Sequence, residues 1–290
     1  MSKVLVMGST GMLGSRIKSE LLRMELDVFW TSRVQGSQLD SREYFLDARY
    51  DNLKFWFRDK PKFDYIINCI GAIPQKYIHR SALEVRDMIE LNTLLPQILS
   101  ESSDMYGFRV LQIATDCVFS GTGSKYSEDS LHDAMDLYGV TKSLGEKNSP
   151  NAMFIRCSVI GNNDPTNSSL HNWLLSKEMN SIVNGFNNHR WNGVTTLAFA
   201  RIVKGIIKDN LFKTGIQHII PSDEVTKYQL LEIIAKVNGR HDLQITSVDH
   251  EMTINRTLSS LYPEKNKLLW SSAGYRHVPL ISDLVLEMDS

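Results

Sequence analysis

Short apolar runs alternate with longer amphipathic segments along the first 160 residues of the chain. Runs of this kind, bounded by glycine or polar residues, predict buried strands, and they lie at 3–7, 27–31, 44–46, 65–70, 110–114 and 153–157. Helix-spaced apolar residues fill the segments between them, at 13–22, 51–58 and 81–102 and again after 138. Pro96 should kink or break the third of these helices. Because strands that alternate with helices form a parallel sheet covered on both faces, we predict an α/β fold with a Rossmann-type, doubly wound parallel sheet.

The pattern becomes irregular after residue 160. Residues 161–165 (GNNDP) interrupt it; helices are predicted at 169–179 and 196–209, and a short strand at 217–221. Thr226 and Gln229 form a capping box for a further helix, which should end at Gly239. We expect residues 161–290 to form mainly a smaller mixed C-terminal lobe, with about 195–222 returning to the sheet of residues 1–160.

A glycine-rich turn follows the first strand at once. Gly8, Gly11 and Gly14 form a G-x-x-G-x-x-G pattern between this strand and the helix after it. Glycines let the backbone approach a pyrophosphate, and a helix N-terminus supplies free N–H groups. A glycine turn that binds nothing is the alternative, but the flanking strand and helix favour a dinucleotide site. The predicted contacts are Gly8, Thr10, Gly11, Met12 and Leu13.

The second strand ends in Ser32-Arg33, where an acidic residue would bind the ribose 2′-hydroxyl of NAD. A hydroxyl and a guanidinium suit the 2′-phosphate of NADP better, so we expect NADP(H) rather than NAD(H). Further cofactor contacts are predicted where the next strands end, namely Asp47, Ala48, Cys69, Ile70 and Gly71. Residues 1–160 are thus the predicted NADP-binding Rossmann domain, and 161–290 are mainly the predicted substrate-binding lobe.

Candidate catalytic residues follow the fifth strand, which ends in Thr115-Asp116-Cys117. Tyr138 and Lys142 are four residues apart and share one face of a predicted helix. We expect the Lys142 ammonium to favour the phenolate and to pull the pKa of Tyr138 from about 10 toward neutrality. Such a phenol, with Thr115 holding the reacting oxygen, can pass a proton to or from a carbonyl or an alcohol. Tyrosine and lysine at this spacing are common on helix surfaces, so the interpretation depends on Thr115 and the glycine turn.

Composition excludes several classes of protein. The 290 residues are 42% hydrophobic, which permits a full core, and carry a net charge of −1, which gives no electrostatic reason to expect nucleic acid or an anionic membrane. Three cysteines without paired spacing indicate neither a disulfide scaffold nor a metal site. No apolar run approaches the roughly 20 residues that span a bilayer, and the N-terminal run is too short for a signal peptide. We expect a soluble cytoplasmic protein.

These motifs together resemble those of the extended short-chain dehydrogenases/reductases, and within them the dTDP-4-dehydrorhamnose reductase group of nucleotide-sugar reductases. The resemblance covers most of the chain. Its motifs are residues 8–14 (GSTGMLG), Thr115-Asp116, residues 118–121 (VFSG), Tyr138 with Lys142, residues 156–161 and residues 192–196 (NGVTT), the last of which lacks the group's usual proline.

The resemblance implies a role for each catalytic candidate. Tyr138 would be the general acid, Lys142 would lower its pKa and hold the nicotinamide ribose, and Thr115 would bind the substrate oxygen. The implied reaction is NADPH-dependent reduction of a nucleotide-activated 4-keto-6-deoxy sugar, in the synthesis of O-antigen or capsule precursors. The resemblance leaves a homodimer open.

Two alternatives remain open at the level of sequence. In GDP-fucose synthase-like enzymes, which epimerise before they reduce, a cysteine stands two positions after the catalytic serine or threonine and works with a histidine after the sixth strand. Cys117 and His171 match that pattern, although a lone cysteine is usually a buried apolar residue. The other alternative is a non-catalytic NADP-binding subunit, like the regulatory subunit of methionine adenosyltransferase. A protein that only binds NADP would not need Thr115, Tyr138 and Lys142 together.

Overall fold

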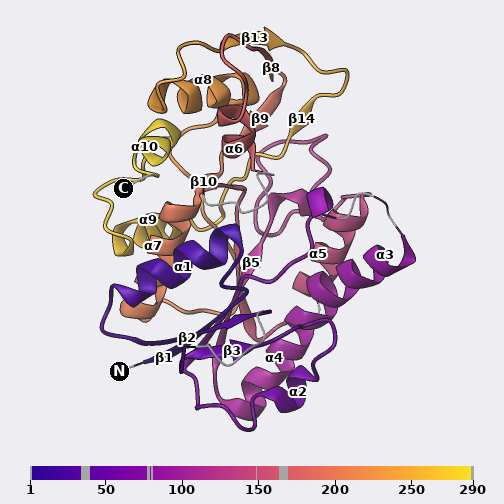
Figure 1. Ribbon diagram of the computed structural model, residues 1–290, viewed down its shortest axis with the longest axis vertical. Helices are drawn as coiled ribbons and strands as arrows, with labels where there is room; N and C mark the ends of the chain where they lie inside the picture. Colours follow the sequence, from indigo (N-terminus) through magenta and orange to yellow (C-terminus); the bar gives the residue numbers. More distant parts are fainter. Residues whose placement is uncertain are drawn as a thin grey trace.

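The computed structural model describes residues 2–33, 40–76, 79, 81–147, 149–162 and 169–288. A layered α/β part and a smaller part of short strands and helices lie one above the other (Figure 1). The smaller part is built mostly from the C-terminal half of the chain.

The main sheet has seven strands in the order β11-β6-β5-β4-β1-β2-β3, and every neighbouring pair is parallel. The bounds are β1 Lys3–Met7, β2 Asp27–Ser32, β3 Glu43–Phe45, β4 Tyr65–Asn68, β5 Arg109–Ala114, β6 Ala152–Arg156 and β11 Gly215–His218. The strand order reverses between β1 and β4, which is where open α/β sheets bind ligands.

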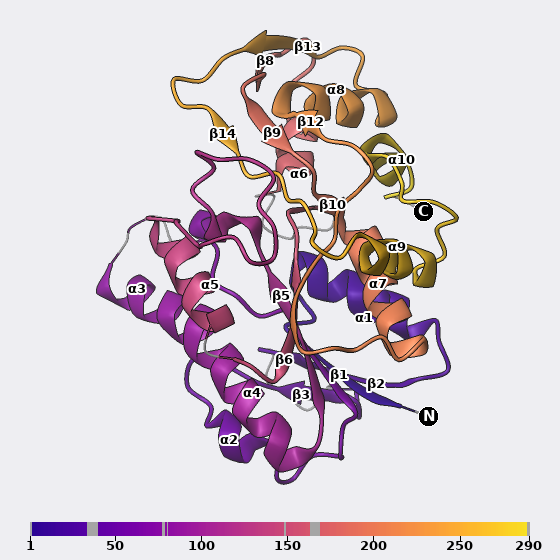
Figure 2. The same ribbon diagram turned by 180° about the vertical axis from the view of Figure 1, so that it is seen from behind.

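Helices cover both faces of this sheet (Figures 1 and 2). One face carries α1 (Met12–Leu22), α7 (Thr196–Lys208) and α9 (Pro263–Ser272), and α7 packs against both of the others. The opposite face carries α2 (Leu53–Trp56), α3 (Ala82–Ile89), α4 (Leu95–Tyr106) and α5 (Leu137–Lys147). Successive side chains of β1 point to opposite faces of the sheet. Val4 and Val6 therefore pack in the core beneath α1, α7 and α9, and Leu5 and Met7 pack in the core on the opposite face. The predicted Rossmann-type sheet is confirmed.

The helix predicted at 81–102 runs continuously past Pro96 but contains a wider turn just before it. A π-helical turn, η2 (Glu90–Leu94), separates α3 from α4. Pro96 lies in the first turn of α4, where a helix needs no N–H from it. The side chain of Asn92 within this turn is buried; its Nδ2 donates to the Ala72 carbonyl and to Thr141 Oγ1, and its Oδ1 accepts from the Ala72 N–H. The wide turn thus ties the loop after β4 to helix α5.

The smaller part combines parallel and antiparallel pairs. β12 (Val225–Thr226) runs antiparallel to β9 (His189–Trp191), while β14 (Ile254–Asn255) runs parallel to it. Two further parallel pairs join β13 (Gln244–Val248) to β8 (Ile182–Phe186) and β10 (Val194–Thr195) to β7 (Val159–Ile160). The helices of this part are α6 (Leu170–Leu175), α8 (Lys227–Val237) and α10 (Ile281–Leu286).

Helix α8 shows the predicted capping box. The Thr226 hydroxyl accepts from the Gln229 N–H at 3.1 Å, and Gln229 Oε1 accepts from the Thr226 N–H at 2.9 Å. Gly239, just beyond the helix, has φ +67°, a conformation that favours glycine. Apolar residues of α8, α6 and α10 share a core with Trp191, which is separate from the two cores of the main sheet.

Candidate active site

The glycine turn lies between the carboxyl ends of β2 and β4. The Gly8 N–H donates to Thr31 Oγ1 at 3.1 Å, and a Cβ on Gly8 would lie 2.9 Å from Ile70 and 3.2 Å from Cys69. A Cβ on Gly14 would lie 2.2 Å from the Gly8 carbonyl oxygen, so only glycine fits there. Both positions require glycine because the backbone itself is closely packed.

The turn also leaves the start of α1 open to an anion. Gly11 is the N-cap, gives no side-chain hydrogen bond, and no acidic residue stands in the first turn. The first N–H groups of a helix lack intrahelical partners, and the helix dipole favours negative charge beside them. Thr10, Met12 and Leu13 lie at this end of α1, so the residues fit the pyrophosphate of a dinucleotide.

The other predicted cofactor residues lie along the same edge of the sheet. Ser32 is buried and Arg33 is exposed at the end of β2. The pKa of Asp47 is lowered, first by its hydrogen bonds with Arg49 and also by the charge of Arg33, so Arg33 and Asp47 are near each other. Ala48, Cys69, Ile70 and Gly71 follow β3 and β4. The predicted cofactor residues therefore lie along the carboxyl edge of strands β1, β2, β3 and β4, which includes the switch point between β1 and β4.

Thr115 and Tyr138 meet at the end of β5. Thr115 is 8% exposed, and its Oγ1 accepts from the Cys117 N–H at 3.2 Å. Burial raises the pKa of Tyr138; the nearby Cys117 adds to this, and a hydrogen bond with Thr115 opposes it. Lys142, one turn further along α5, donates from Nζ to the Ile113 carbonyl at 2.8 Å. The predicted trio thus lies together around the end of one buried strand.

The expected direction of the Tyr138 pKa is wrong in this structure. Burial disfavours the charged phenolate and so raises the pKa of Tyr138. Burial also lowers the pKa of Lys142, and the negative charge of Glu146 opposes that second shift. A phenol whose pKa is raised stays protonated at neutral pH. Tyr138 is therefore protonated but a weak acid, and burial by itself does not activate it for proton transfer.

Cys117 and His171 do not come together. His171 is buried, and its ring nitrogens lie 3.3 Å from Asn172 Oδ1 and 3.4 Å from Asn238 Nδ2, at the C-terminal end of α8. The N-terminal end of α8, at Lys227, is the end near Cys117. The 11 residues of α8 span about 16 Å, so the helix separates the two candidates. Burial also raises the pKa of the Cys117 thiol to about 12. The predicted acid/base pair is not formed.

Two cations from the C-terminal half lie at the site, and the sequence interpretation missed both. Arg256 donates from Nη1 to Cys117 Sγ at 3.6 Å. Burial raises the pKa of Asp116, and the charges of Arg256 and then Lys227 oppose that rise. Lys227 is the first residue of α8, and the sequence pattern there indicated only a helix start. Arg256 lies in a stretch without apolar periodicity, so no pattern marked it.

The NGVTT segment holds Arg256 in place. Asn192 donates from Nδ2 to the Leu258 carbonyl at 2.8 Å and accepts the Leu258 N–H at 2.9 Å. Gly121, at the end of the VFSG motif, has φ +87°, and its carbonyl accepts from the Asn255 N–H at 2.8 Å. These contacts fix the chain on both sides of Arg256.

Of the neighbouring residues that could hold a nucleotide, Trp191 is 3% exposed and packs in the core of the smaller part. Arg190 is paired with Glu224. In the part of the chain that the structure describes, no group of His, Cys, Asp and Glu side chains could hold a metal ion. Within those same residues, no helix is both long and apolar enough to cross a bilayer.

A parallel sheet with a glycine turn at its switch point and a Thr-Tyr-Lys cluster beside it defines the extended short-chain dehydrogenase/reductase class. The chain belongs to the RmlD substrate binding domain family, whose model matches residues 2–260.

Known proteins agree with this assignment. A dTDP-4-dehydrorhamnose reductase of Aggregatibacter actinomycetemcomitans is 25% identical over 281 residues, covering 90% of each chain. Methionine adenosyltransferase 2 subunit beta of Xenopus tropicalis is 25% identical over 180 residues, covering 54% of this chain and 47% of that one. Among solved structures, a Bacillus anthracis dTDP-4-dehydrorhamnose reductase in complex with NADP has a TM-score of 0.79 at 16% identity, covering 100% of this chain and 99% of that one.

Proposed function

We propose that the chain is an NADP-dependent oxidoreductase that reduces a keto group of a nucleotide-activated sugar. The observation that carries the proposal is the cluster of Thr115, Tyr138 and Lys142 beside the glycine turn. The family relative named dTDP-4-dehydrorhamnose reductase, which aligns over 90% of its length, supports the same reaction. The finer assignment is a 4-keto-6-deoxy sugar, reduced for O-antigen or capsule precursors in the cytoplasm.

The bound cofactor would supply a hydride, and the N-terminal turn of α1 with Arg33 would hold its phosphates. Thr115 would hold the substrate oxygen next to the phenol of Tyr138, because the two side chains already interact. Tyr138 would donate its proton to that oxygen as negative charge develops there, so that no alkoxide stands uncompensated. Lys142 would hold the nicotinamide ribose with an ammonium that now contacts the Ile113 carbonyl.

Arg256 and Lys227 would bind the substrate. Both cations lie beside Asp116 at the end of β5, and together they outnumber its single carboxylate. A guanidinium and an ammonium suit the diphosphate that a nucleotide-activated sugar carries. Residues 161–290 would then be mainly the substrate-binding lobe.

The test is NADPH consumption with a panel of dTDP-, UDP- and GDP-linked 4-keto-6-deoxy sugars, followed by NMR of each product. We expect one nucleotide series to be reduced, with the new hydroxyl at C4. NADPH binding without consumption of any sugar in the panel would contradict the proposal.

That second outcome would favour a binding protein. The similarity to methionine adenosyltransferase 2 subunit beta, over 54% of this chain, is the observation behind this alternative. Retention of Thr115, Tyr138 and Lys142 in one cluster favours the enzyme, since binding alone does not need all three.

A further inference from the structure

The two cations beside Asp116 share one face of a small sheet with a histidine. Strand β9 lies between β12 and β14, and Ile254 of β14 pairs with His189 of β9. Paired side chains point to the same face and alternate along a strand, so Arg256, two residues beyond Ile254, lies on the face of His189. On the other side of β9, the register with β12 extended by one residue brings Lys227 level with His189.

The charge environment of His189 agrees with this placement. Burial lowers the pKa of His189 first, and the hydrogen bond to the Met252 carbonyl opposes the shift. The positive charges of Lys227 and Arg256 lower the pKa further, so both cations lie near the imidazole. Arg256 also contacts Cys117 at the end of β5. The cations are therefore neighbours of both the candidate catalytic residues and His189, which is uncharged at neutral pH.

Three half-buried rings gather at this place, those of Phe186, His189 and His250. Their centroids are 4.8 Å apart for Phe186 and His189, 5.0 Å for Phe186 and His250, and 5.2 Å for the two histidines. The ring planes are tilted against each other by 51–70°, so no ring lies flat on another. Partly exposed rings of this kind can stack on a nucleobase.

The hydrogen bonds of the two histidines fix which ring nitrogens carry hydrogen. His189 Nε2 lies 3.1 Å from the Met252 carbonyl oxygen, which can only accept, so Nε2 is the donor and Nδ1 remains an acceptor. His250 Nδ1 accepts the Met252 N–H at 3.2 Å, so the hydrogen of a neutral ring is on Nε2. Within the described residues, His189 Nδ1 and His250 Nε2 have no hydrogen-bond partner. The pair thus offers one acceptor and one donor, and nucleobase edges carry a donor and an acceptor side by side.

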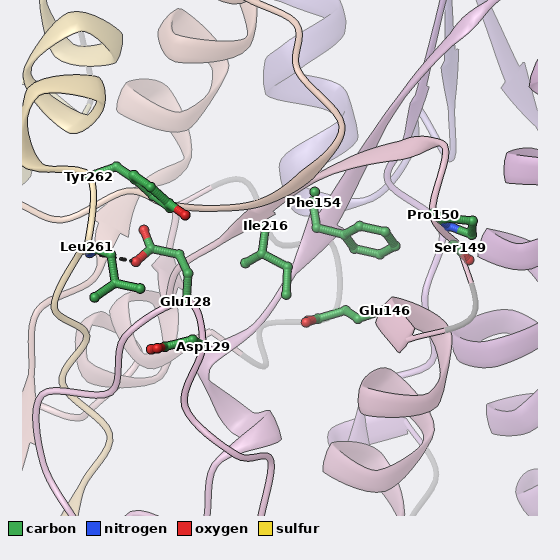
Figure 3. A pocket seen from close by; sticks show the side chains of 10 residues that line it. Glu128, Asp129, Glu146, Ser149, Pro150, Phe154, Ile216, Leu261 and Tyr262 are labelled. Carbon is green, nitrogen blue, oxygen red and sulfur yellow. Dashed lines mark hydrogen bonds between the residues drawn. The ribbon is translucent and has the colours of Figure 1, made fainter.

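Figure 3 shows a different cavity, of about 350 Å³, beside β6 and β11. Its lining includes the carboxylates of Glu128 and Asp129. Among the residues that the structure describes, neither an arginine nor a lysine lines it. Carboxylates do not suit the negatively charged phosphates of a nucleotide, so the rings beside Arg256 and Lys227 are the better place for one.

We propose that His189 and His250 bind the nucleobase of the sugar nucleotide and set which nucleotide series the enzyme accepts. The base would bond to His189 Nδ1 and His250 Nε2 and stack on a ring of the cluster, while the diphosphate lies on Arg256 and Lys227. The assignment rests on the proposed function, because the nucleotide is taken to be that of the reducible sugar.

The first experiment is isothermal titration of the whole protein with dTDP, UDP and GDP, with NADP⁺ present in excess so that the cofactor site is filled. Inorganic pyrophosphate is the control without a base. We expect at least one nucleoside diphosphate to bind about tenfold or more tightly than pyrophosphate. His250→Ala should weaken that binding by about tenfold and leave pyrophosphate binding unchanged, because a hydrogen bond and a stacking ring are lost. His241→Ala, the same change at an exposed histidine, is the matched control.

The second experiment is steady-state kinetics with the reducible sugar. His250→Ala should raise KM by about tenfold and change kcat by no more than about twofold, since the base takes no part in the chemical step. His250→Gln should bind more tightly than His250→Ala, because its amide can replace the Nε2–H. This rescue separates recognition of the base from a loss of folding.

The two proposals fail in different ways. A sugar reduced by His250→Ala with the parental KM would overturn the base assignment and leave the reductase in place. Equal binding of pyrophosphate and every nucleoside diphosphate, or an equal loss in the Ala and Gln variants, would also overturn the assignment. Binding of a nucleoside diphosphate that depends on His250, without reduction of any sugar, would support the assignment and contradict the reductase.

Discussion

The Tyr138 side chain lies among Thr115, Asp116 and Cys117, at the end of a buried strand. Burial raises its pKa, the nearby Cys117 and Asp116 add to the rise, and the Lys142 ammonium on the same helix face donates to the Ile113 carbonyl. Burial therefore keeps the Tyr138 phenol protonated at neutral pH.

Tyr138→Phe should lower turnover by roughly 10²-fold or more, because the ring remains but the proton donor is lost. NADPH affinity should stay near that of the parent, as measured by fluorescence titration. Lys142→Met should reduce both turnover and NADPH affinity. A Phe variant that turned over at the parental rate would remove Tyr138 from the mechanism.

Arg33→Ala should weaken NADPH binding by about 1.5–3 kcal/mol, the range for a hydrogen bond to a charged group. NADH binding should hardly change, because NADH has no 2′-phosphate. Titration of both cofactors against the parent and the variant checks this. Equal losses for the two cofactors would place Arg33 away from the 2′-phosphate.

Among the elements, the π-helical turn η2 has the clearest role, since it aims Asn92 at both Ala72 and Thr141. The sequence indicated a helix with a break near Pro96, but not a π turn, because apolar periodicity does not register one extra residue. The glycine turn, Thr115 and the Tyr138–Lys142 pair were predictable because each depends on a strand end or a helix turn. The positions of Arg256 and Lys227 at the site, and the separation of His171 from Cys117, were not predictable, since they depend on contacts between residues distant in sequence.

Asn92→Leu should destabilise the protein by about 1–3 kcal/mol, because it leaves the Ala72 N–H and carbonyl without partners in a buried place. Activity should fall as well, since the turn connects the loop after β4 to the helix that carries Lys142. Urea unfolding and turnover measure the two effects. Asn151→Leu, another asparagine that bonds to α4 but from a less buried place, is the matched control and should retain activity.

The histidines that join β6, β11 and the loop at residue 132 should make the fold sensitive to acid. His132 and His218 have pKa values of about 4 in the folded protein, lowered by burial and by Arg156, against about 6.5 when unfolded. The unfolded chain therefore binds more protons between these values, so stability should be lost as the pH falls from about 6.5 toward 4. The urea midpoint measured across this range should fall, and His132→Asn should flatten the dependence. A midpoint that stayed constant from pH 7 to 5 would contradict this.

At the scale of the whole molecule, the candidate active site is completed by the smaller part. Arg256 and Lys227 reach Cys117 and Asp116 from segments more than 100 residues further along the chain. The α/β architecture could be predicted from the pattern of strands and helices, whereas this convergence could not, because no local signal marks either cation.

Arg256→Ala should raise the KM for the sugar nucleotide by about tenfold or more, since a charge-assisted contact is lost. The affinity for NADPH should remain unchanged, because Arg256 contacts Cys117 and is proposed to bind the substrate diphosphate. Steady-state kinetics with the reducible sugar, together with cofactor titration, separate the two. Glu251→Ala, an exposed charge in the same stretch, serves as the control.

Helix α7 and strand β11 cover surfaces of elements that are synthesised before them, and this affects the growing chain. The apolar face of α1, with Ile17 and Leu21, packs against α7, and the edge of β6 is covered by β11. When the ribosome has made the first 160 residues, neither of those partners yet exists. The nascent protein then carries an exposed apolar helix face and an unpaired strand edge until residue 218 has emerged, which is the interval when it is most exposed to aggregation and to chaperones.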